Sequence, residues 1–323
     1  MREVTTQPEF RRKGYIKSLM TEALKHMRLR GQSLSILYPF KHAFYRKYGY
    51  AVFGDMTVLK SDPNNVTLPE SFQPLHIEKF TKDESFAKIK AFRSKIGRNY
   101  NLVMHENPTT WKFFHFRDRD ELRVVKDGED IVGYFISRIK DLPSSKWATS
   151  LDFGEVIVAR ETARLTILDY IKKHKDQTKE FRWPLMGDEQ IFDYFNDLWA
   201  LKIETYPAAM FRVVDVEQAL QKLKFPRDVT VSFSLQLHDD FAPWNEDPLL
   251  IEIDEGNAQV AQVDKLNGHV DLETDITAFT QLFVGYKTIG QLAATNKLNV
   301  KEKIKPQLAK AFPKKTTRLT THF

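Results

Sequence analysis

The chain contains no cysteine in its 323 residues. This absence excludes disulfide bonds, thiolate metal sites and a cysteine nucleophile, and it suits a reducing compartment. The sequence also lacks any run near the roughly 18 to 20 apolar residues that a membrane-spanning helix needs. Its first residues, MREVTTQPEF, have no apolar stretch that could act as a secretion signal. We therefore expect a cytoplasmic protein that does not associate with membranes.

The remaining composition indicates a folded protein of several domains without a metal site. Hydrophobic residues make up 42% of the chain and charged residues 28%, which is typical of globular proteins. A chain of this length is expected to form more than one domain. Polar residues such as His105, Glu106 and His115 do not have the spacing of metal ligands, so we expect structural roles for them and no bound metal.

Positive charge is concentrated in one part of the chain. Residues 1–60 hold 12 Lys and Arg against 4 Asp and Glu, a balance of +8, so the rest of the chain carries −2 of the net +6. A compact basic region on a remainder that is not basic indicates a local site for a polyanion, either nucleic acid or a phosphorylated cofactor. Since no DNA-recognition element stands out, we expect no nucleic-acid partner.

The basic region has the pattern of a strand, a loop and a helix. Val4, Thr5 and Thr6 favour a short strand, and apolar residues at spacings of three and four indicate the helix, which Gly31 is placed to end. The apolar positions are Ile16, Leu19, Met20, Ala23, Leu24 and Met27. Gly14 lies at the turn into this helix, where free backbone N–H groups and the helix dipole favour a phosphate.

Four cations surround this helix start. Arg11, Arg12 and Lys13 precede it directly, and Lys17 follows one turn later. Such residues also occur at solvated helix ends, yet positive side chains oppose the dipole at a helix N-terminus unless an anion is bound there. We therefore favour an anion-binding site, in which the side chains add charge where a pyrophosphate would lie.

The same residues resemble a known motif. Val4, Pro8, Arg11, Arg12, Lys13 and Gly14 are spaced as in the acetyl-CoA motif of the GNAT N-acetyltransferases, Arg/Gln-x-x-Gly-x-Gly/Ala. Ile16 departs from the small residue of the general motif, but a bulky aliphatic residue there is similar to the enhanced-intracellular-survival (Eis) branch. The resemblance implies that the backbone of Val4, Thr5 and Thr6 pairs with the pantetheine of acetyl-CoA. It also implies a pyrophosphate site formed by Arg12, Lys13, Gly14, Tyr15, Ile16 and Lys17.

A second motif follows at the distance expected for this family. After a strand-like segment at 33–38 comes Phe44-Tyr45-Arg46-Lys47-Tyr48-Gly49-Tyr50, which resembles the family's Phe-Tyr-x-x-x-Gly-Tyr motif. In the family the first Tyr lies beside the cofactor sulfur and protonates the departing thiolate, which implies this role for Tyr45. A thiol with a pKa of about 8.5 that leaves beside a phenol with a pKa of about 10 requires a modest uphill transfer, which positioning can offset.

Residues around Tyr45 are interpreted differently from one another. Phe40 and Lys41 match the pair that contacts the cofactor after this strand in the family. Tyr48 and Tyr50 fit core packing at the turn into the next strand, as aromatic residues there usually do. His42 could act on a substrate amine, but we expect it to be incidental.

The middle of the chain repeats this order in a weaker form. A hairpin at 122–136 turns at Asp127-Gly128, and a strand at 155–158 leads through a loop into an amphipathic helix. In the loop, Ala163 replaces the glycine, and Glu161 brings a negative charge to where phosphate would approach. Both changes oppose pyrophosphate binding. We interpret this stretch as a degenerate second GNAT unit, so we expect one cofactor site rather than two, as in the family.

The last third of the chain has a different pattern. A helix at 216–223 precedes strands at 229–237, 248–253, 258–263 and 269–273 and helices at 276–284 and 289–294. This order resembles the sterol-carrier-protein-like domain that closes the Eis family and forms a wall of its active site. The chain ends on Phe323, and the resemblance implies that the α-carboxylate of this residue points into the first domain as the general base. A mobile tail is the alternative.

Together these patterns predict a mixed α/β (α+β) protein of three domains. They are a partial GNAT domain with the acetyl-CoA motif at 1–60, a second, degenerate GNAT domain at 61–212 and a sterol-carrier-protein-like domain at 213–323. The expected activity is direct transfer of an acetyl group from acetyl-CoA to an amine. The resemblance implies an aminoglycoside-like or polyamine acceptor and a homo-oligomer, a hexamer. The alternatives are a lipid-binding sterol-carrier-like module and an inactive fragment.

The position of the first motif leads to a further expectation. A GNAT domain has several strands and helices ahead of the loop that follows residue 4 here, which amount to about 70 residues at ordinary lengths. We therefore expect Met1 to be an internal methionine of a longer protein. In the chain as given, the expected strand Val4–Thr6 would form an exposed sheet edge, which costs stability.

Overall fold

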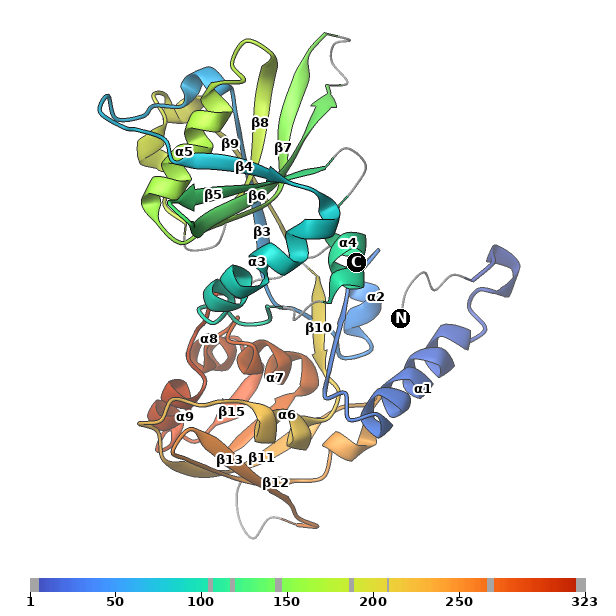
Figure 1. The fold of residues 1–323 in the computed structure, drawn as a ribbon. Coiled ribbons are helices and arrows are strands. Elements are labelled where there is room, and N and C mark those ends of the chain that lie inside the picture. Colours follow the sequence, from blue (N-terminus) through green and yellow to red (C-terminus); the bar gives the residue numbers. More distant parts are fainter. Residues whose placement is uncertain are drawn as a thin grey trace. The chain divides into compact units, whose positions relative to one another are not determined.

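The computed structural model describes residues 6–103, 107–116, 120–142, 147–185, 189–207, 209–265 and 270–317, with the backbone alone at 113–115. Contacts within the chain divide it into two compact units. The first unit consists of Met1–Gly54 and Ala208–Thr317, and the second contains the stretch between them, Asp55–Pro207. Figure 1 shows the elements of both units. None of the helices in these described ranges is long and apolar enough to cross a membrane.

The N-terminal part of the first unit is built around a three-stranded sheet. Its elements are η1 (Pro8–Phe10), α1 (Tyr15–Leu29), β1 (Leu34–Leu37), α2 (His42–Arg46) and β2 (Ala51–Val52). The middle strand of the sheet is β10 (Met210–Val213), which pairs antiparallel with β1 on one side and with β2 on the other. A strand from far along the chain therefore completes the sheet that the N-terminal residues begin.

Helix α1 forms where the apolar spacing predicted it. It begins after Gly14, which has a left-handed φ of 83°, and ends close to Gly31, which has a φ of 68°. Met20 and Leu24 are buried on its inner face, whereas Leu19 is 43% exposed. The buried stripe is therefore narrower than the sequence pattern indicated.

A small core holds α1 against this sheet. Met20, Tyr48, Tyr50 and Met210 are buried together. Partly buried apolar and aromatic residues complete this cluster: Ile16, Leu37, Phe44, Tyr45, Val52 and Phe241. Because Met210 and Phe241 belong to the C-terminal part of the chain, the N-terminal residues do not bury their apolar surface alone.

The rest of the first unit is an α+β arrangement on a five-stranded sheet of order β13-β12-β11-β14-β15. The strands are β11 (Val231–His238), β12 (Leu249–Asp254), β13 (Asn257–Gln262), β14 (Leu272–Asp275) and β15 (Leu298–Val300). The other elements are α6 (Val216–Lys222), η5 (Pro243–Asn245), α7 (Ile276–Phe283), α8 (Ile289–Ala294) and α9 (Lys305–Ala311). Buried and exposed residues alternate along β12, so one face of the sheet packs inward. The predicted helices and strands are confirmed to within a few residues, whereas β15 and α9 were not predicted.

The second unit has a seven-stranded sheet of order β4-β5-β6-β7-β8-β3-β9. Its strands are β3 (Asp55–Ser61), β4 (His76–Phe80), β5 (Glu121–Asp127), β6 (Asp130–Asp141), β7 (Thr149–Val158), β8 (Thr178–Leu185) and β9 (Lys202–Pro207). Its helices are α3 (Lys82–Gly97), α4 (Pro108–His115) and α5 (Glu161–Lys172), with short turns η2 (Pro63–Asn65), η3 (Phe192–Tyr194) and η4 (Leu198–Ala200). The predicted hairpin is confirmed as β5 and β6, and the predicted strand–loop–helix is β7 followed by α5.

Helices cover both faces of this second sheet. On β5, Leu122 and Val124 pack in one cluster with residues of α3 and α4, whereas Val125 packs in another with residues of α5. Alternate residues of a strand point to opposite faces of its sheet. The β5 side chains therefore separate two apolar cores, and α5 covers the face opposite to α3 and α4.

The two units do not meet at the predicted domain limits. The sequence placed boundaries after residues 60 and 212, whereas the contacts separate Gly54 from Asp55 and the second unit ends at Pro207. The reason is that β3 belongs to the second sheet and β10 to the N-terminal sheet. Of the expected strand at the start, Val4 and Thr5 lie outside the described residues. Thr6 forms neither helix nor strand, and its carbonyl oxygen accepts a 3.1 Å hydrogen bond from Nε of Arg11.

Candidate active site

The start of α1 is open to a ligand. Gly14 is the N-cap residue, and its left-handed backbone turns the loop into the helix. Within the described part of the chain, no side chain caps the first turn, and that turn holds no acidic residue. Apart from Gly14 itself and its two chain neighbours, no described residue has an atom within 4 Å of a Cβ added at Gly14. The N–H groups of the first turn are therefore accessible to an anion.

The predicted cations are exposed around this helix start. They are Arg11, Arg12, Lys13 and Lys17. Arg12 has a left-handed φ of 63°, a conformation that residues other than glycine seldom adopt. Nζ of Lys13 lies 5.1 Å from the ring centre of Phe10, and Nζ of Lys17 lies 5.8 Å from the ring centre of Phe241. Both lysines are within the range of a cation–π contact, which restricts where each ammonium group lies.

Tyr45 is half-buried in an aromatic cluster on α2. Its ring centre lies 5.6 Å from that of Phe40, 5.1 Å from that of Phe44 and 6.3 Å from that of Tyr50. Burial raises the pKa of the Tyr45 phenol above its usual value. The phenol therefore stays protonated at neutral pH and can donate a proton.

The first helix and Tyr45 meet in one core. Ile16, in the first turn of α1, packs against the same buried cluster as Tyr45, whereas Tyr15 is 55% exposed. Phe40 is 75% exposed although it contacts Tyr45, and Lys41 is an exposed residue at the N-cap of α2. An exposed aromatic ring beside a half-buried phenol leaves apolar surface that a ligand can cover.

The turn after Tyr45 is fixed by backbone hydrogen bonds. The carbonyl oxygen of Tyr45 accepts one from the N–H of Tyr48 at 2.9 Å and one from the N–H of Tyr50 at 3.3 Å. Between them, Gly49 has a left-handed φ of 77°. The hydroxyl groups of Tyr50 and Ser35 are 2.7 Å apart, and burial raises the pKa of Tyr50. Tyr48 and Tyr50 thus pack in the core, as the sequence predicted.

Three residues from the C-terminal part reach this turn or the helix start, and sequence reasoning missed them. Nη1 of Arg212 donates to the carbonyl oxygen of Tyr48, and its Nη2 lies 2.7 Å from each carboxylate oxygen of Asp239. The ring of Phe241 lies 4.9 Å from that of Tyr48, centre to centre. A signal existed for Arg212 alone, because it interrupts an otherwise apolar strand pattern. Of the other predicted site residues, Val4, Thr5 and Phe323 lie outside the described residues.

The start of α5, in the second unit, holds an acidic residue in its first turn. Its N-cap residue is Arg160, with an ordinary φ of −142°, so Arg160 rather than Ala163 has the place of the glycine in α1. Glu161 lies in the first turn and accepts a 2.6 Å hydrogen bond from the hydroxyl of Tyr194. Nε of Arg164 lies 3.0 Å from the same carboxylate. A negative side chain in the first turn therefore disfavours a bound anion at this helix start.

Two family models match parts of this chain. Residues 1–53 match an acetyltransferase (GNAT) domain, and residues 216–319 match a sterol carrier protein domain. They correspond to the N-terminal and C-terminal parts of the first structural unit. The predicted mixed α/β fold class, with a GNAT-type part at the start and a sterol-carrier-like part at the end, is confirmed. No curated protein matches the chain.

Solved structures share the fold over nearly the whole chain. A GCN5-related N-acetyltransferase from Anabaena variabilis ATCC 29413 superposes with a TM-score of 0.86 at 19% identity, over 99% of this chain and 80% of its own. A conserved protein of unknown function from Enterococcus faecalis V583, a probable N-acyltransferase, has a TM-score of 0.82 at 24% identity, over 97% and 78%. Eis1 from Mycobacterium abscessus has 0.76 at 15%, over 99% and 81%. At such identities the likeness establishes the fold.

Proposed function

We propose that this protein is an N-acetyltransferase that binds acetyl-CoA at the start of α1 and transfers the acetyl group directly to an amine. The observation that carries the proposal is the open, positively charged start of α1, where Gly14 has a left-handed φ and the cations are exposed. The pyrophosphate of acetyl-CoA has the charge and size for such a site. The match of residues 1–53 to a GNAT domain supports acetyl transfer as the class of reaction.

The proposed binding residues follow the two motifs. The pyrophosphate would be held by Arg12, Lys13, Gly14, Tyr15, Ile16 and Lys17. The backbone of Val4, Thr5 and Thr6 would pair with the pantetheine, and this assignment rests on the resemblance to the Eis branch alone. Phe40 and Lys41 would contact acetyl-CoA next to Tyr45, and the 75% exposure of the Phe40 ring supports that contact.

The proposed chemistry needs one acid and one base. The amine nitrogen attacks the acetyl carbonyl carbon, the carbon–sulfur bond breaks, and the electron pair of that bond leaves with sulfur. Tyr45 donates its proton to the thiolate, and its raised pKa keeps that proton in place until the thiolate forms. The proton lost from the amine goes to a base, for which we propose the α-carboxylate of Phe323 on the resemblance alone.

We propose an aminoglycoside-like compound or a polyamine as the acceptor, and a hexamer as the assembly. Both assignments come from the resemblance to the Eis branch alone. Compounds of either class carry several amines, which are cationic at neutral pH, so a base is needed to free the attacking nitrogen.

The test is a thiol-release assay on the purified full chain. Acetyl-CoA is mixed with a panel of polyamines and aminoglycosides, and free coenzyme A is detected with a thiol reagent. Because the chain has no cysteine, the protein itself gives no signal with the reagent. We expect release that depends on the amine, together with an acetylated product by mass spectrometry. The contrary outcome has two parts: calorimetry detects no binding of coenzyme A, and a fluorescent fatty acid is displaced in a saturable manner. These results would instead identify a lipid-binding module.

A further inference from the structure

One segment of the C-terminal part contacts the N-terminal part at several points. It consists of residues 239–245, between β11 and β12, and is called here the docking segment. Three of its side chains make such contacts. Phe241 and Trp244 contact the N-terminal part directly, and Asp239 acts through Arg212. The segment lies within the part that matches a sterol carrier protein domain. Its contacts reach α1 and the turn after α2, which are the two halves of the proposed site.

Asp239 fixes the turn that follows Tyr45 by way of Arg212. Arg212 is 0% exposed and Asp239 is 2% exposed, and both carboxylate oxygens accept from Nη2 of Arg212 at 2.7 Å. Nη1 of Arg212 donates to the carbonyl oxygen of Tyr48. The guanidinium lies directly against Gly49, where an added Cβ would be 1.9 Å from Nη1. A buried, charge-assisted pair of this kind holds its groups in one geometry.

The turn passes this restraint to the catalytic side chain. Tyr48 and Tyr50 both donate their backbone N–H groups to the carbonyl oxygen of Tyr45. When Arg212 holds the carbonyl of Tyr48, it also holds the peptide that closes the end of α2. The position of the Tyr45 phenol relative to the start of α1 therefore depends on an ion pair whose acid, Asp239, lies in the docking segment.

Phe241 links the same turn to the start of α1. The centre of its ring lies 4.9 Å from the ring centre of Tyr48, with an angle of 64° between the planes. Nζ of Lys17 lies 5.8 Å from the centre of the same ring. The ring thus packs against the turn and also attracts the ammonium group of Lys17, which is proposed to bind the pyrophosphate.

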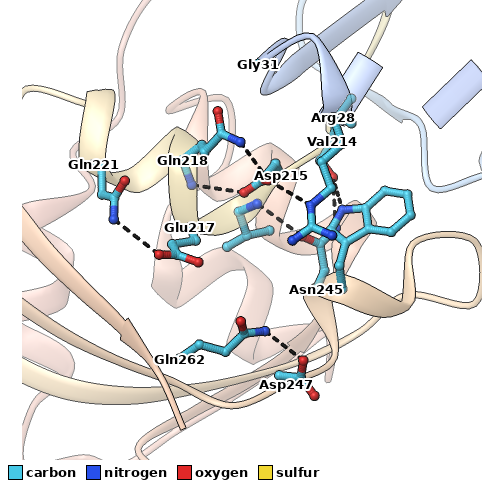
Figure 2. Close-up of polar contacts among 12 residues, drawn as sticks. Arg28, Gly31, Val214, Asp215, Glu217, Gln218, Gln221, Asn245, Asp247 and Gln262 are labelled. Atoms are coloured by element: carbon cyan, nitrogen blue, oxygen red, sulfur yellow. Dashed lines mark hydrogen bonds and ion pairs between the residues drawn. The ribbon is translucent and has the colours of Figure 1, made fainter. Parts of the chain in front are cut away.

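Trp244 restrains the other end of α1. Figure 2 shows the side chain of Arg28 reaching Asp215, with Nε 3.1 Å from the carboxylate. The guanidinium carbon of Arg28 lies 5.1 Å from the ring centre of Trp244, and the indole N–H donates to the carbonyl oxygen of Val214 at 2.8 Å. Asn245 donates to the same oxygen at 3.1 Å, also visible in Figure 2. Both ends of α1 are therefore restrained from the C-terminal part.

We infer that the docking segment is a positioning element of the acetyl-CoA site, in which Phe241 orients Lys17 at the phosphate end and Asp239, through Arg212, holds the turn that places Tyr45 at the sulfur end. This inference rests on the proposed function of α1 and Tyr45. It gives the sterol-carrier-like part a role in catalysis that requires no lipid.

The phosphate end is tested by Phe241→Leu in the full chain. Leucine keeps an apolar contact with the core and removes the aromatic face under Lys17. We expect the dissociation constant for coenzyme A, measured by calorimetry, to rise about two- to fivefold, the range of an exposed cation–π contact. The KM for acetyl-CoA is expected to rise by a similar factor.

The sulfur end is tested by Arg212→Met combined with Asp239→Asn. Both charges are removed together, because removing one would leave the other buried and unpaired. We expect kcat to fall about tenfold or more, since small displacements of a catalytic group are costly, with little change in coenzyme A affinity. Amide hydrogen exchange at Tyr48 and Tyr50 should also become faster, which reports on the turn without any assay of activity.

The matched control is Phe312→Leu. Phe312 is 3% exposed and packs on Phe225 within the C-terminal part, so this change destabilises the same part at a place away from the site. Variants that match this control in affinity, kcat and amide exchange would overturn the positioning role. If the double variant does not fold, an unchanged coenzyme A affinity in Phe241→Leu overturns it alone. Failure of the unaltered protein to bind coenzyme A would instead defeat the proposed function itself.

Discussion

Helices α1 and α5 differ in the backbone conformation of their N-cap residues and in the charged residues of their first turns. At α1 the N-cap is Gly14 with a left-handed backbone, and four exposed cations surround the start. At α5 the N-cap is Arg160 with an ordinary backbone, and Glu161 lies in the first turn. The hydroxyl of Tyr194 and the guanidinium of Arg164 both bind that glutamate. The first turn of α1 holds no acidic residue, whereas that of α5 holds one.

The difference shows how the same local architecture gains or loses an anion site. A helix N-terminus attracts negative charge from any source, because its N–H groups and dipole do not discriminate between a side chain and a ligand. Glu161 supplies that charge internally, and Arg164 is held further by Glu189, with 11% and 9% of the two side chains exposed. The carboxylate of Glu161 would repel a ligand anion at the start of α5. We therefore propose one acetyl-CoA site, at α1.

The largest expected effect is on the acid, Tyr45. Tyr45→Phe removes the proton donor and keeps the ring, so we expect kcat to fall about a hundredfold or more, with coenzyme A affinity unchanged. The same substitution in the second unit, Tyr194→Phe, is the matched control and is expected to leave kcat unchanged. Steady-state kinetics and calorimetry measure both. Equal turnover in the two variants would remove Tyr45 from the mechanism.

The next largest effect is expected on coenzyme A affinity, when the charge around α1 is changed. Arg12→Glu combined with Lys13→Glu should raise the dissociation constant for coenzyme A about ten- to a hundredfold, because two favourable charge interactions become repulsive. Lys175→Glu with Lys179→Glu changes the net charge equally on exposed residues near the end of α5. This control should bind normally. The difference in dissociation constant between the two double variants should narrow as salt is added, since exposed charges are screened. Equally weakened binding in both would mean a response to net charge rather than to a site.

A smaller effect, on the free energy of unfolding, is expected from substitutions of the two N-cap residues. Gly14→Ala puts a Cβ on a backbone with a φ of 83°, which costs about 1 to 2 kcal/mol of unfolding free energy although space is free around it. Arg160→Ala, at an ordinary φ of −142°, should change stability by no more than about 0.5 kcal/mol. Urea unfolding of both variants measures the difference. If Gly14→Ala costs no more than Arg160→Ala, the left-handed turn into α1 is not needed.

Local patterns predicted the features that depend on neighbouring residues. The spacing of apolar residues indicated α1, and Glu161 marked α5 as unsuited to phosphate, because both signals lie within a few residues of the feature. The partners of Glu161 and Arg164 at the start of α5 could not be predicted in this way. Tyr194 and Glu189 approach Glu161 and Arg164 through the folding of the second unit, and no spacing in the sequence connects them.

The same limit applies to the first unit. The run Met210–Val213 was not predicted as a strand, and an apolar run does not say which sheet it joins; in the structure it forms β10 of the N-terminal sheet. The pairing of Arg212 with Asp239 and the contact of Phe241 with Lys17 follow from that placement. The residues proposed to act chemically were therefore predictable from motifs, whereas those proposed to position them required the structure.

The smallest expected effect is on the pH dependence of stability that Tyr194 contributes at the start of α5. Burial and the carboxylate of Glu161 raise the pKa of Tyr194 to about 12. In the unfolded chain this pKa returns to about 10, so the stability that Tyr194 contributes is fully present below about pH 10 and is lost as pH rises toward about 12. Tyr194→Phe should therefore flatten the decline in unfolding free energy over this range. A decline as steep in Tyr194→Phe as in the unaltered protein would mean that Tyr194 does not bind Glu161 in solution.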